Sequence, residues 1–260
     1  MPRYNIMPKK SMGQHFLKDL DIANRIAATL ADFDKLPVLE VGAGTGALTR
    51  FLIDKGYDLS IVELDREAVA LLRRLFPDLA ERITEADFLR MQPQEMPQGQ
   101  FCIIGNYPYN ISTQIFFKLI ELRDRVACCS GMLQKEVAER LASPPGRKAY
   151  GILSVLLQAW YDVEYLFTVD ETVFDPPPKV KSAVIRATRN ARTELGCDEA
   201  QMKRVVKTAF NQRRKTMRNS LKPLLGNDFP HYADPIFNLR PEQLSVEQFV
   251  DLTKMIENCR

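Results

Sequence analysis

The amino-acid sequence predicts an α/β fold, with one open sheet that carries helices on both faces, followed by a small all-helical C-terminal domain. Three observations lead to this prediction. Short apolar runs rich in β-branched residues alternate with longer segments whose apolar residues recur at helical spacing. A glycine-rich turn at residues 42–46 connects one such run directly to a helix. After residue 189 the strand-like runs stop and only helical patterns follow.

Composition limits the classes of protein to consider. The chain has 260 residues, 45% of them hydrophobic, which is enough for a domain of residues 1–190 and a smaller one of residues 191–260. Residues 1–12 are polar and basic, and we expect a flexible arm there. The five cysteines are scattered without a Cys-x-x-Cys pair, so we expect neither a disulfide framework nor a metal site. No signal peptide and no apolar run near 18 residues is present, which predicts a cytoplasmic protein without a membrane segment.

Charge is distributed unevenly along the chain. The net charge is only +3, but residues 203–222 carry eight Lys or Arg and no acid. Residues 179–192 carry five and residues 1–18 carry four, again without an acid. Such segments on a nearly neutral chain predict a one-sided positive surface.

The elements of the first domain are predicted in order along the chain. A helix over residues 19–30 follows the segment that contains His15. The predicted strands then cover residues 37–41, 59–64, 82–86, 101–104, 125–133, 162–169 and 183–187, and the predicted helices cover residues 47–55, 66–76, 112–122, 134–141 and 151–160.

The first three strands of this series indicate a nucleoside site. Residues 42–46 (Gly-Ala-Gly-Thr-Gly) place backbone N–H groups at a helix start, close to a ligand. Glu63 ends the next strand, 21 residues after Gly42, where an acidic residue can bind ribose hydroxyls. The spacing is not Gly-x-Gly-x-x-Gly, which disfavours an NAD site. Asp87 ends the third strand; it can accept a hydrogen bond from an adenine amine or simply cap a turn.

The stretch Gly-Asn-Tyr-Pro-Tyr-Asn at residues 105–110 follows a buried strand that we expect to end at Gly105. Ligands bind at the ends of strands in open α/β sheets. Asn106 can accept hydrogen bonds from the exocyclic amine of a base, and Tyr109 can stack on its ring. Taken alone, the stretch fits a plain strand-to-helix turn equally well.

Three further segments contain candidate binding residues. Residues 143–148 form a Pro- and Gly-rich basic loop that suits either a phosphate contact or a plain connection. Three prolines stiffen residues 173–180 and can present Phe174 as a second stacking surface. Residues 202–222 keep helical spacing, with one apolar face and a basic face that favours phosphate binding over simple solvation.

Together these motifs resemble the class I S-adenosylmethionine-dependent methyltransferases that act on adenine N6, and more closely the small-subunit rRNA adenine dimethyltransferases, the KsgA family. The resemblance covers nearly the whole chain and implies a Rossmann-like sheet. The matching segments are residues 13–17 (Gly-Gln-His-Phe-Leu), 40–46 (Glu-Val-Gly-Ala-Gly-Thr-Gly), 63–65 (Glu-Leu-Asp), Asp87, 105–112 (Gly-Asn-Tyr-Pro-Tyr-Asn-Ile-Ser), 148–151 (Lys-Ala-Tyr-Gly), 174–180 (Phe-Asp-Pro-Pro-Pro-Lys-Val) and 213–219 (Arg-Arg-Lys-Thr-Met-Arg-Asn).

The resemblance implies roles for individual residues. The methyl donor, S-adenosyl-L-methionine, would be bound by His15, Leu17, Gly42, Gly44, Glu63, Asp87 and Asn106, without a metal. Asn106, Tyr109 and Phe174 would hold the target adenine. The RNA would be bound by Arg147, Lys148, Lys207, Arg213, Arg214, Lys215, Arg218 and Lys222. The family usually has a small aliphatic residue where Tyr107 stands and an acid where Lys181 stands, so the shape and charge of the pocket can differ here.

The implied activity is N6,N6-dimethylation of two adjacent adenosines near the 3′ end of small-subunit rRNA, on an assembling 30S particle, by a monomer. The alternatives are a large-subunit rRNA dimethyltransferase of the macrolide-resistance type, and a ribosome-assembly factor whose catalysis is dispensable. A DNA adenine methyltransferase is disfavoured because no separate target-recognition region is found.

Overall fold

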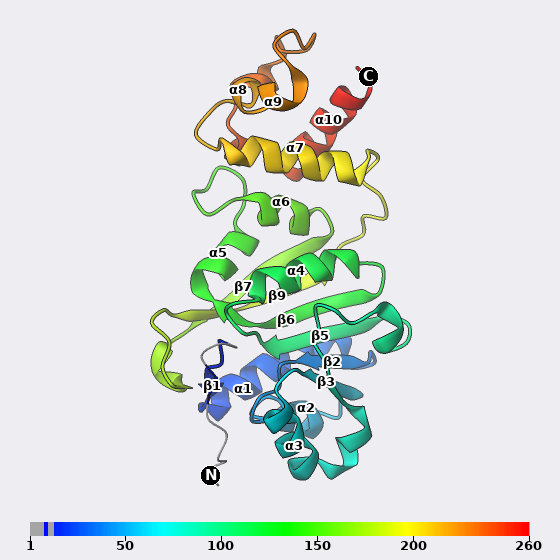
Figure 1. Cartoon of the computed structure of the whole chain (residues 1–260), viewed down its shortest axis with the longest axis vertical. Helices are drawn as coiled ribbons and strands as arrows, with labels where there is room; N and C mark the ends of the chain where they lie inside the picture. The colour runs from blue at the N-terminus through cyan, green and yellow to red at the C-terminus, as the bar shows by residue number, and fades with distance from the viewer. Residues whose placement is uncertain (1–7, 10–12, 260) are drawn as a thin grey trace. The chain divides into compact units, whose positions relative to one another are not determined.

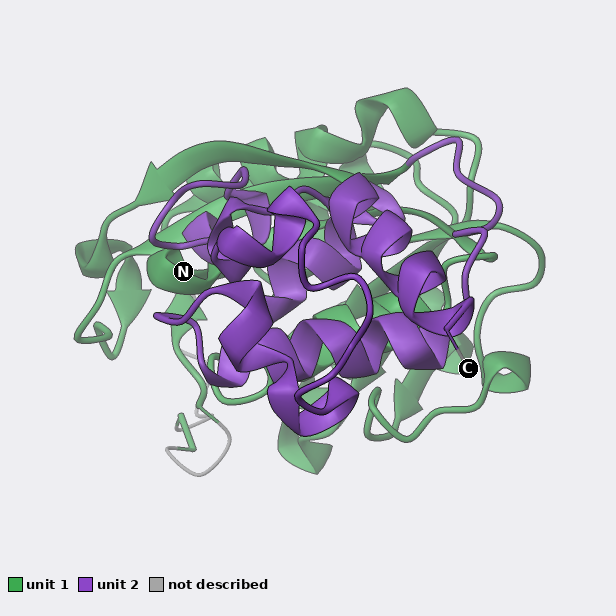
Figure 2. Ribbon diagram, turned by 90° about the horizontal axis from the view of Figure 1, so that it is seen from above, with its two compact units in different colours: residues 1–138, 162–189 green, residues 139–161, 190–260 purple. Residues whose placement is uncertain are grey.

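The computed structural model describes residues 8–9 and 13–259, and this part of the chain divides into two compact units. Unit 1 comprises residues 1–138 and 162–189, and unit 2 comprises residues 139–161 and 190–260 (Figure 2). One division falls at residue 190, where we placed the domain boundary. Residues 139–161, which we assigned to the first domain, belong instead to unit 2. Most of the basic arm predicted at residues 1–12 lies outside the described residues.

Unit 1 is built on a seven-stranded sheet of order β4-β3-β2-β5-β6-β9-β7 (Figure 1). Neighbours from β4 to β6 pair in parallel, and β9 pairs antiparallel to β6. A separate two-stranded antiparallel sheet joins β1 to β8. The strands are β1 (Phe16–Leu17), β2 (Val38–Val41), β3 (Leu59–Glu63), β4 (Ile83–Glu85), β5 (Phe101–Asn106), β6 (Val126–Gln134), β7 (Tyr161–Val169), β8 (Phe174–Asp175) and β9 (Ser182–Arg189).

The helices of unit 1 connect these strands. They are α1 (Leu20–Ala27), α2 (Thr49–Asp54), α3 (Arg66–Leu75), α4 (Ser112–Glu121) and α5 (Lys135–Ala142), which runs on into unit 2, with short 3₁₀ helices η2 (Ala28–Phe33), η3 (Pro77–Arg82), η4 (Pro93–Glu95) and η5 (Glu171–Val173). The alternation of strands and helices confirms the predicted α/β fold.

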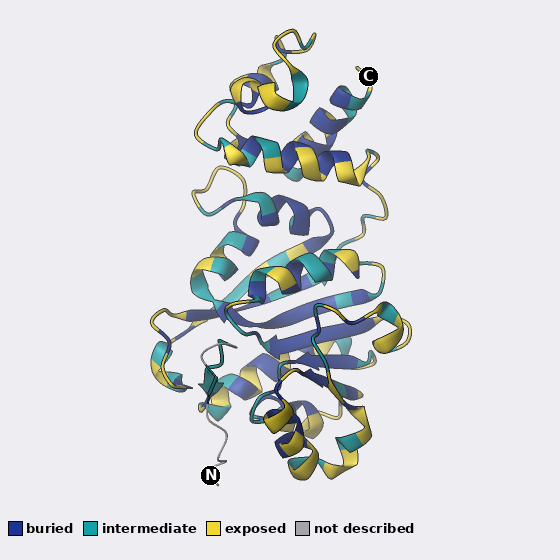
Figure 3. Cartoon of the chain, viewed as in Figure 1, coloured by how far each residue is buried: buried dark blue, intermediate teal, exposed yellow. Residues whose placement is uncertain are grey.

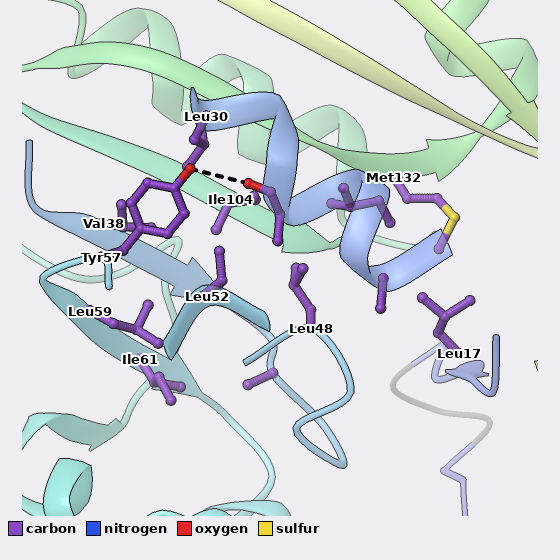
Figure 4. Packing of buried hydrophobic residues seen from close by; sticks show 14 of the residues in the cluster. Leu17, Leu30, Val38, Leu48, Leu52, Tyr57, Leu59, Ile61, Ile104 and Met132 are labelled. Carbon is purple, nitrogen blue, oxygen red and sulfur yellow. Dashed lines mark hydrogen bonds between the residues drawn. The ribbon is translucent and has the colours of Figure 1, made fainter. Parts of the chain in front are cut away.

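Both faces of the sheet are covered. Along β5, Cys102 and Ile104 belong to the apolar cluster that also contains Ile26 of α1. Side chains alternate between the faces of a strand, so Phe101 and Ile103 point to the opposite face, and both are completely buried. Figure 3 shows the central strands as mostly buried. Figure 4 shows the α1 side, where the hydroxyl of Tyr57 donates a hydrogen bond to a backbone carbonyl at 3.3 Å.

The strand order positions the site. From β2 the chain runs outward through β3 to β4, and then returns to place β5 on the other side of β2. This reversal makes the carboxyl ends of β2 and β5 a topological switch point, where ligands bind in open α/β sheets. Gly42 follows β2 directly, and β5 extends to Asn106, one residue beyond the end that we predicted.

Unit 2 is helical. It contains α6 (Ile152–Gln158), α7 (Glu199–Asn211), α8 (Met217–Ser220), α9 (Lys222–Leu225), α10 (Val246–Glu257) and the 3₁₀ helices η6 (Pro235–Asn238) and η7 (Pro241–Gln243). The side chain of Asp198 caps α7, and Ser245 with Gln248 forms a capping box for α10. Phe210 lies 6.3 Å from the Tyr150 ring and 6.0 Å from that of Phe249, measured between centroids.

The prediction of a helical segment with a basic face over residues 202–222 is wrong. Helix α7 ends at Asn211, and Gln212 has non-helical backbone angles (φ −123°, ψ 45°). Residues 213–215, the Arg-Arg-Lys segment, therefore lie in a turn before α8. The helical spacing continued across this break because Phe210 and Met217, on either side of it, both turn toward the interior of unit 2.

The described helices are short or polar, and the cysteines are unpaired. None of these helices is both long and apolar enough to cross a membrane. All five cysteines are free thiols, and Cys102, Cys128 and Cys129 are buried in unit 1.

Candidate active site

A cavity of about 180 Å³ lies at the carboxyl ends of β2, β3 and β5. It collects segments that are far apart in the sequence, from residues 13–17 through the glycine-rich turn to residues 106–111. Every residue that we predicted to bind the donor lines it: His15, Leu17, Gly42, Gly44, Glu63, Asp87 and Asn106. Tyr109, predicted to stack on the base, lines it as well.

The glycine-rich turn is tied to β3 by Glu63. One carboxylate oxygen of Glu63 accepts a hydrogen bond from Gly44 N at 2.9 Å, and the other accepts one from Asp65 N at the same distance. Gly44 has a φ of +57°, and a Cβ there would lie 3.2 Å from the Phe16 ring, so glycine is required. Burial raises the pKa of Glu63, although these two bonds act against the shift. Each oxygen keeps a lone pair for a ligand hydroxyl.

Glu40 is a second acid in the cavity wall, one to which we assigned no role. Burial, reinforced by the charge of Glu63, raises the pKa of Glu40 to about 8, although the Thr49 hydrogen bond lowers it. The Thr49 hydroxyl donates to the Glu40 carboxyl at 2.7 Å. At neutral pH the carboxyl is therefore mostly protonated. The sequence signal for this residue was an acid inside an otherwise apolar strand.

The side chains of Asn106 and Tyr109 are held in fixed orientations. The Asn106 amide donates to the His15 carbonyl at 3.2 Å, which leaves its Oδ1 free to accept. The Tyr109 hydroxyl pairs with the Ser182 hydroxyl at 2.5 Å, and burial raises the pKa of Tyr109. Its ring lies 5.2 Å from the His15 ring, centroid to centroid. The cavity thus combines one oriented amide acceptor with two aromatic rings.

The hydroxyl of Tyr107 is directed into the core. That hydroxyl donates to the Ser130 carbonyl at 2.7 Å and lies 3.2 Å from Cys129 Sγ. The ring packs edge-on against Phe116, with centroids 6.0 Å apart. The Tyr107 side chain therefore brings no hydroxyl into the cavity.

Phe174 is the predicted site residue that the structure does not bring to the cavity. It is completely buried, pairs with Leu17 across the β1–β8 sheet and belongs to the apolar core. It is not among the residues that line the cavity. The expectation that the proline-rich loop presents this ring to the base is not met in this state, because the apolar side chain packs into the nearest core.

Asp87 caps a turn and also lies in the cavity wall, so its position is compatible with both of the roles that the sequence left open. Its carboxylate accepts a hydrogen bond from Leu89 N at 3.0 Å, as a turn cap does, and the residue also lines the cavity. Leu64, which follows Glu63, lines the cavity with 53% of its surface exposed. An apolar surface beside two acids suits the face of a nucleoside base. We assigned no role to Leu64, and nothing in its local pattern distinguished it from a buried strand residue.

The sequence was then compared with protein families. The profile described as ribosomal RNA adenine dimethylase matches residues 6–258.

The chain belongs to the ribosomal RNA adenine dimethylase family.

Curated relatives support the same family and favour the small-subunit interpretation over the large-subunit one. The chain is 68% identical over 248 residues to ribosomal RNA small subunit methyltransferase A of Parabacteroides distasonis, covering 95% of this chain and 93% of the relative. It is 59% identical over 254 residues to the protein of that name from Porphyromonas gingivalis, covering 97% and 98%. The predicted enzyme class, an rRNA adenine dimethyltransferase, is confirmed.

Two solved structures have the same fold. A dimethyladenosine transferase from Plasmodium falciparum aligns with a TM-score of 0.79 at 23% identity, covering 94% of this chain and 98% of that one. The 23S rRNA methyltransferase ErmE aligns with a TM-score of 0.69 at 26% identity, covering 92% and 99%.

Two basic segments predicted to bind RNA meet within unit 2 of this adenine dimethylase. Arg213 donates from Nη2 to the Arg147 carbonyl at 3.2 Å, and its Nε lies 3.8 Å from the Glu242 carboxylate. The Gly146 N–H donates to the Glu242 carbonyl at 2.6 Å. The remaining predicted RNA-binding residues of unit 2 are exposed: Lys148, Lys207, Arg214, Lys215, Arg218 and Lys222.

Across residues 8–9 and 13–259, no group of three or more His, Cys, Asp or Glu is arranged to hold a metal ion.

Proposed function

We propose that this enzyme transfers methyl groups from S-adenosyl-L-methionine to N6 of two adjacent adenosines near the 3′ end of small-subunit rRNA, on an assembling 30S particle. The observation that carries the proposal is the orientation of Asn106. Its amide is held by the His15 carbonyl, so its oxygen remains available as an acceptor in a cavity whose wall also contains Glu63, Asp87 and Tyr109. We place the enzyme in the cytoplasm as a monomer.

The donor fits the residues of the cavity. The Glu63 carboxylate is positioned for ribose hydroxyls and Asp87 for an exocyclic amine, while Leu64 offers an apolar surface to the adenine ring. The absence of a side chain at Gly44 lets backbone approach the ligand. When bound, the donor supplies a methyl group already activated on a sulfonium.

The target adenine is held at Asn106 and Tyr109. The N6 lone pair is delocalised into the purine, so N6 is a poor nucleophile. Hydrogen bonds from the amine to Asn106 Oδ1 and to the Tyr107 carbonyl favour the tetrahedral nitrogen that attacks the methyl group. Tyr109 stacks on the base; aromatic stacking contributes about 1–3 kcal/mol per base.

The protein acts by positioning the two reactants, and no covalent enzyme intermediate is formed. In-line placement of N6 and the methyl group can lower the barrier by about 7–11 kcal/mol. The proton lost after transfer needs no dedicated base. A second transfer requires room for the monomethylated amine, with its remaining hydrogen still accepted by Asn106. The adenosine must first leave the base stack of the RNA.

Substitution of Asn106 tests the assignment. Asn106→Ala is expected to abolish methyl transfer to undermethylated small subunits, while the dissociation constant for S-adenosyl-L-methionine changes only a few-fold. Asn24→Ala, at an exposed position on α1, is the matched control. Rapid transfer by Asn106→Ala would remove Asn106 from the mechanism.

A second experiment tests the substrate. The protein is incubated with labelled S-adenosyl-L-methionine and with undermethylated small subunits, large subunits, free rRNA or DNA, and the label is mapped. We expect two adjacent labelled adenosines in small-subunit rRNA. Label confined to large-subunit rRNA would overturn the proposal, and label in none of the four would favour an assembly factor.

A further inference from the structure

The loop of residues 176–181 is attached at both ends to the rings that line the cavity. His15 donates from Nδ1 to the Pro176 carbonyl at 2.8 Å. Ser182, which follows the loop, pairs with the Tyr109 hydroxyl at 2.5 Å. The His15 and Tyr109 rings lie 5.2 Å apart between centroids. Because both anchors reach side chains of the cavity wall, the loop stands at its rim.

The middle of this rim loop exposes an apolar side chain between two cations. Val180 keeps 47% of its surface exposed, and Lys179 and Lys181 on either side are exposed too. Lys181 pairs with Asp170 at 3.1 Å. Lys179 forms no ion pair within the described part of the chain. Large apolar side chains this exposed are few here, and Leu64, another of them, already lies in the donor site.

We propose that the 176–181 loop binds the RNA strand beside the target adenosine: Lys179 contacts a backbone phosphate, and Val180 occupies the place in the base stack that the adenosine leaves on entering the cavity. This inference rests on the proposed function. Unstacking a base costs a few kcal/mol, and proteins that distort nucleic acids often insert an apolar side chain at the opened step.

The charge and size of the surface favour RNA over a protein partner. A protein interface needs an apolar area of several residues, whereas here one aliphatic side chain stands between cations. A nucleic-acid strand presents phosphates at the spacing of neighbouring nucleotides, with base faces between them. Hydrogen bonds fix both ends of the loop. In addition, the Lys135 N–H donates a hydrogen bond to the Lys181 carbonyl at 3.0 Å, and together these bonds keep Val180 in place.

The test uses the full-length protein and the adenosine that labelled S-adenosyl-L-methionine identifies in small-subunit rRNA. For the fluorescence measurement, that adenosine is replaced by 2-aminopurine, whose fluorescence rises when it leaves the base stack. Methylation is measured on RNA that keeps the adenosine, because 2-aminopurine has no N6 amine. Val180→Ser is compared with Ile53→Ser, an exposed apolar position on α2, and Lys179→Ala is compared with Lys55→Ala. Affinity for S-adenosyl-L-methionine and thermal unfolding are measured for each variant, and Val180→Ala replaces Val180→Ser if the latter unfolds early.

Each variant has a distinct expected result. Val180→Ser loses most of the fluorescence rise and lowers the single-turnover methylation rate about tenfold, with RNA affinity within about twofold of the parent. Lys179→Ala weakens RNA binding several-fold and reduces the slope of log K against log salt by about one, while fluorescence at saturating RNA is retained. The Ile53 and Lys55 variants behave like the parent protein.

Three outcomes contradict the proposal. Native fluorescence and native methylation by Val180→Ser would remove Val180 from base unstacking. An unchanged salt slope for Lys179→Ala would remove the phosphate contact. A defect of both variants on protein-containing particles, but not on protein-free rRNA, would show that the loop binds a ribosomal protein. Failure of the parent protein to methylate any rRNA would instead refute the proposed function, because that result does not depend on the variants.

Discussion

Asn106 and Tyr107 are adjacent in the sequence, but their side chains lie in different environments. Asn106 lines the cavity, whereas the Tyr107 hydroxyl is bonded to the Ser130 carbonyl inside the core. Two glycines leave the space for the Tyr107 ring. A Cβ at Gly105 would lie 2.9 Å from that ring, and one at Gly131 would lie 2.6 Å from it. The ring thereby anchors the strand end that carries Asn106.

Removal of the Tyr107 hydroxyl should lower stability and leave catalysis largely intact. Tyr107→Phe deprives the buried Ser130 carbonyl of its donor, which costs about 1–3 kcal/mol of unfolding free energy. Urea unfolding measures the loss, and methylation at saturating substrate should stay within about threefold of the parent, as expected for a hydrogen bond outside the reacting centre. A large fall in kcat with unchanged stability would show that the hydroxyl acts on the reaction itself.

Glu40 makes stability depend on pH. Burial raises the pKa of Glu40 to about 8, whereas a glutamate in an unfolded chain titrates near about 4.3. Between these values the folded protein holds one more proton than the unfolded chain. The free energy of unfolding contributed by Glu40 therefore falls as pH rises from about 4.3 to about 8.

Glu40→Gln should remove this pH dependence, because glutamine is a neutral analogue that can still accept from Thr49. In the absence of S-adenosyl-L-methionine, the free energy of unfolding of the variant is expected to rise by about 2–4 kcal/mol relative to that of the parent between pH 5 and pH 8. Urea unfolding at pH 5, 6.5 and 8 measures this gain. Glu85→Gln, on the exposed face of β4, is the control. Parallel pH profiles for the parent and Glu40→Gln would contradict a protonated Glu40.

Among the elements, the turn after α7 decides how the basic side chains are presented. Because α7 ends at Asn211, Arg213 is free to reach the carbonyl of Arg147 in the other basic loop. Glu242 holds both loops, through its carbonyl to Gly146 and its carboxylate to Arg213. The basic residues of segments 147–148 and 213–215 thus lie on two joined loops, whereas Lys207, Arg218 and Lys222 lie on three different helices.

Charge removal from these basic residues should weaken RNA binding. We expect substitution of Arg213, Arg214 and Arg218 together by Gln to reduce affinity for small-subunit rRNA and to lower the salt slope by about two to three. The affinity for S-adenosyl-L-methionine should be unaffected. A matched triple substitution of exposed cations in unit 1, at Lys35, Lys55 and Arg74, is the control. Equal losses in both triple variants would mean that only net charge matters.

At the scale of the whole molecule, the chain leaves unit 1 after residue 138 and returns to it at residue 162. The intervening segment contains α6, whose residues Leu153, Val155 and Leu157 are buried. Helix α6 packs against α7 and α10, which come from the C-terminal part of the chain. Unit 2 is therefore assembled from two separate stretches of sequence.

A fragment of residues 1–190 should not behave as an independent domain. Without α7 and α10 it exposes the apolar residues of α6, and exposed apolar surface promotes association. We expect the fragment to bind a hydrophobic dye and to aggregate, in contrast to the full chain, in assays by dye fluorescence and size-exclusion chromatography. A monomeric fragment with a cooperative unfolding transition would show that α6 does not depend on its partners.

The sequence by itself predicted the order of the seven strands of the main sheet and of helices α1 to α5, and it singled out residues that line the cavity. These features depend on short segments: the apolar runs define the strands, and Gly42, Glu63 and Asn106 follow strand ends that must share one edge of a parallel sheet.

Only the tertiary structure decided which side chains meet. It buried Phe174 in the core, directed the Tyr107 hydroxyl toward Ser130, and joined Arg147 to Arg213. It also assigned residues 139–161 to the helical unit. Each of these outcomes depends on contacts between distant segments, and local periodicity is the same whether an apolar side chain finds its partners in its own segment or in one far along the chain.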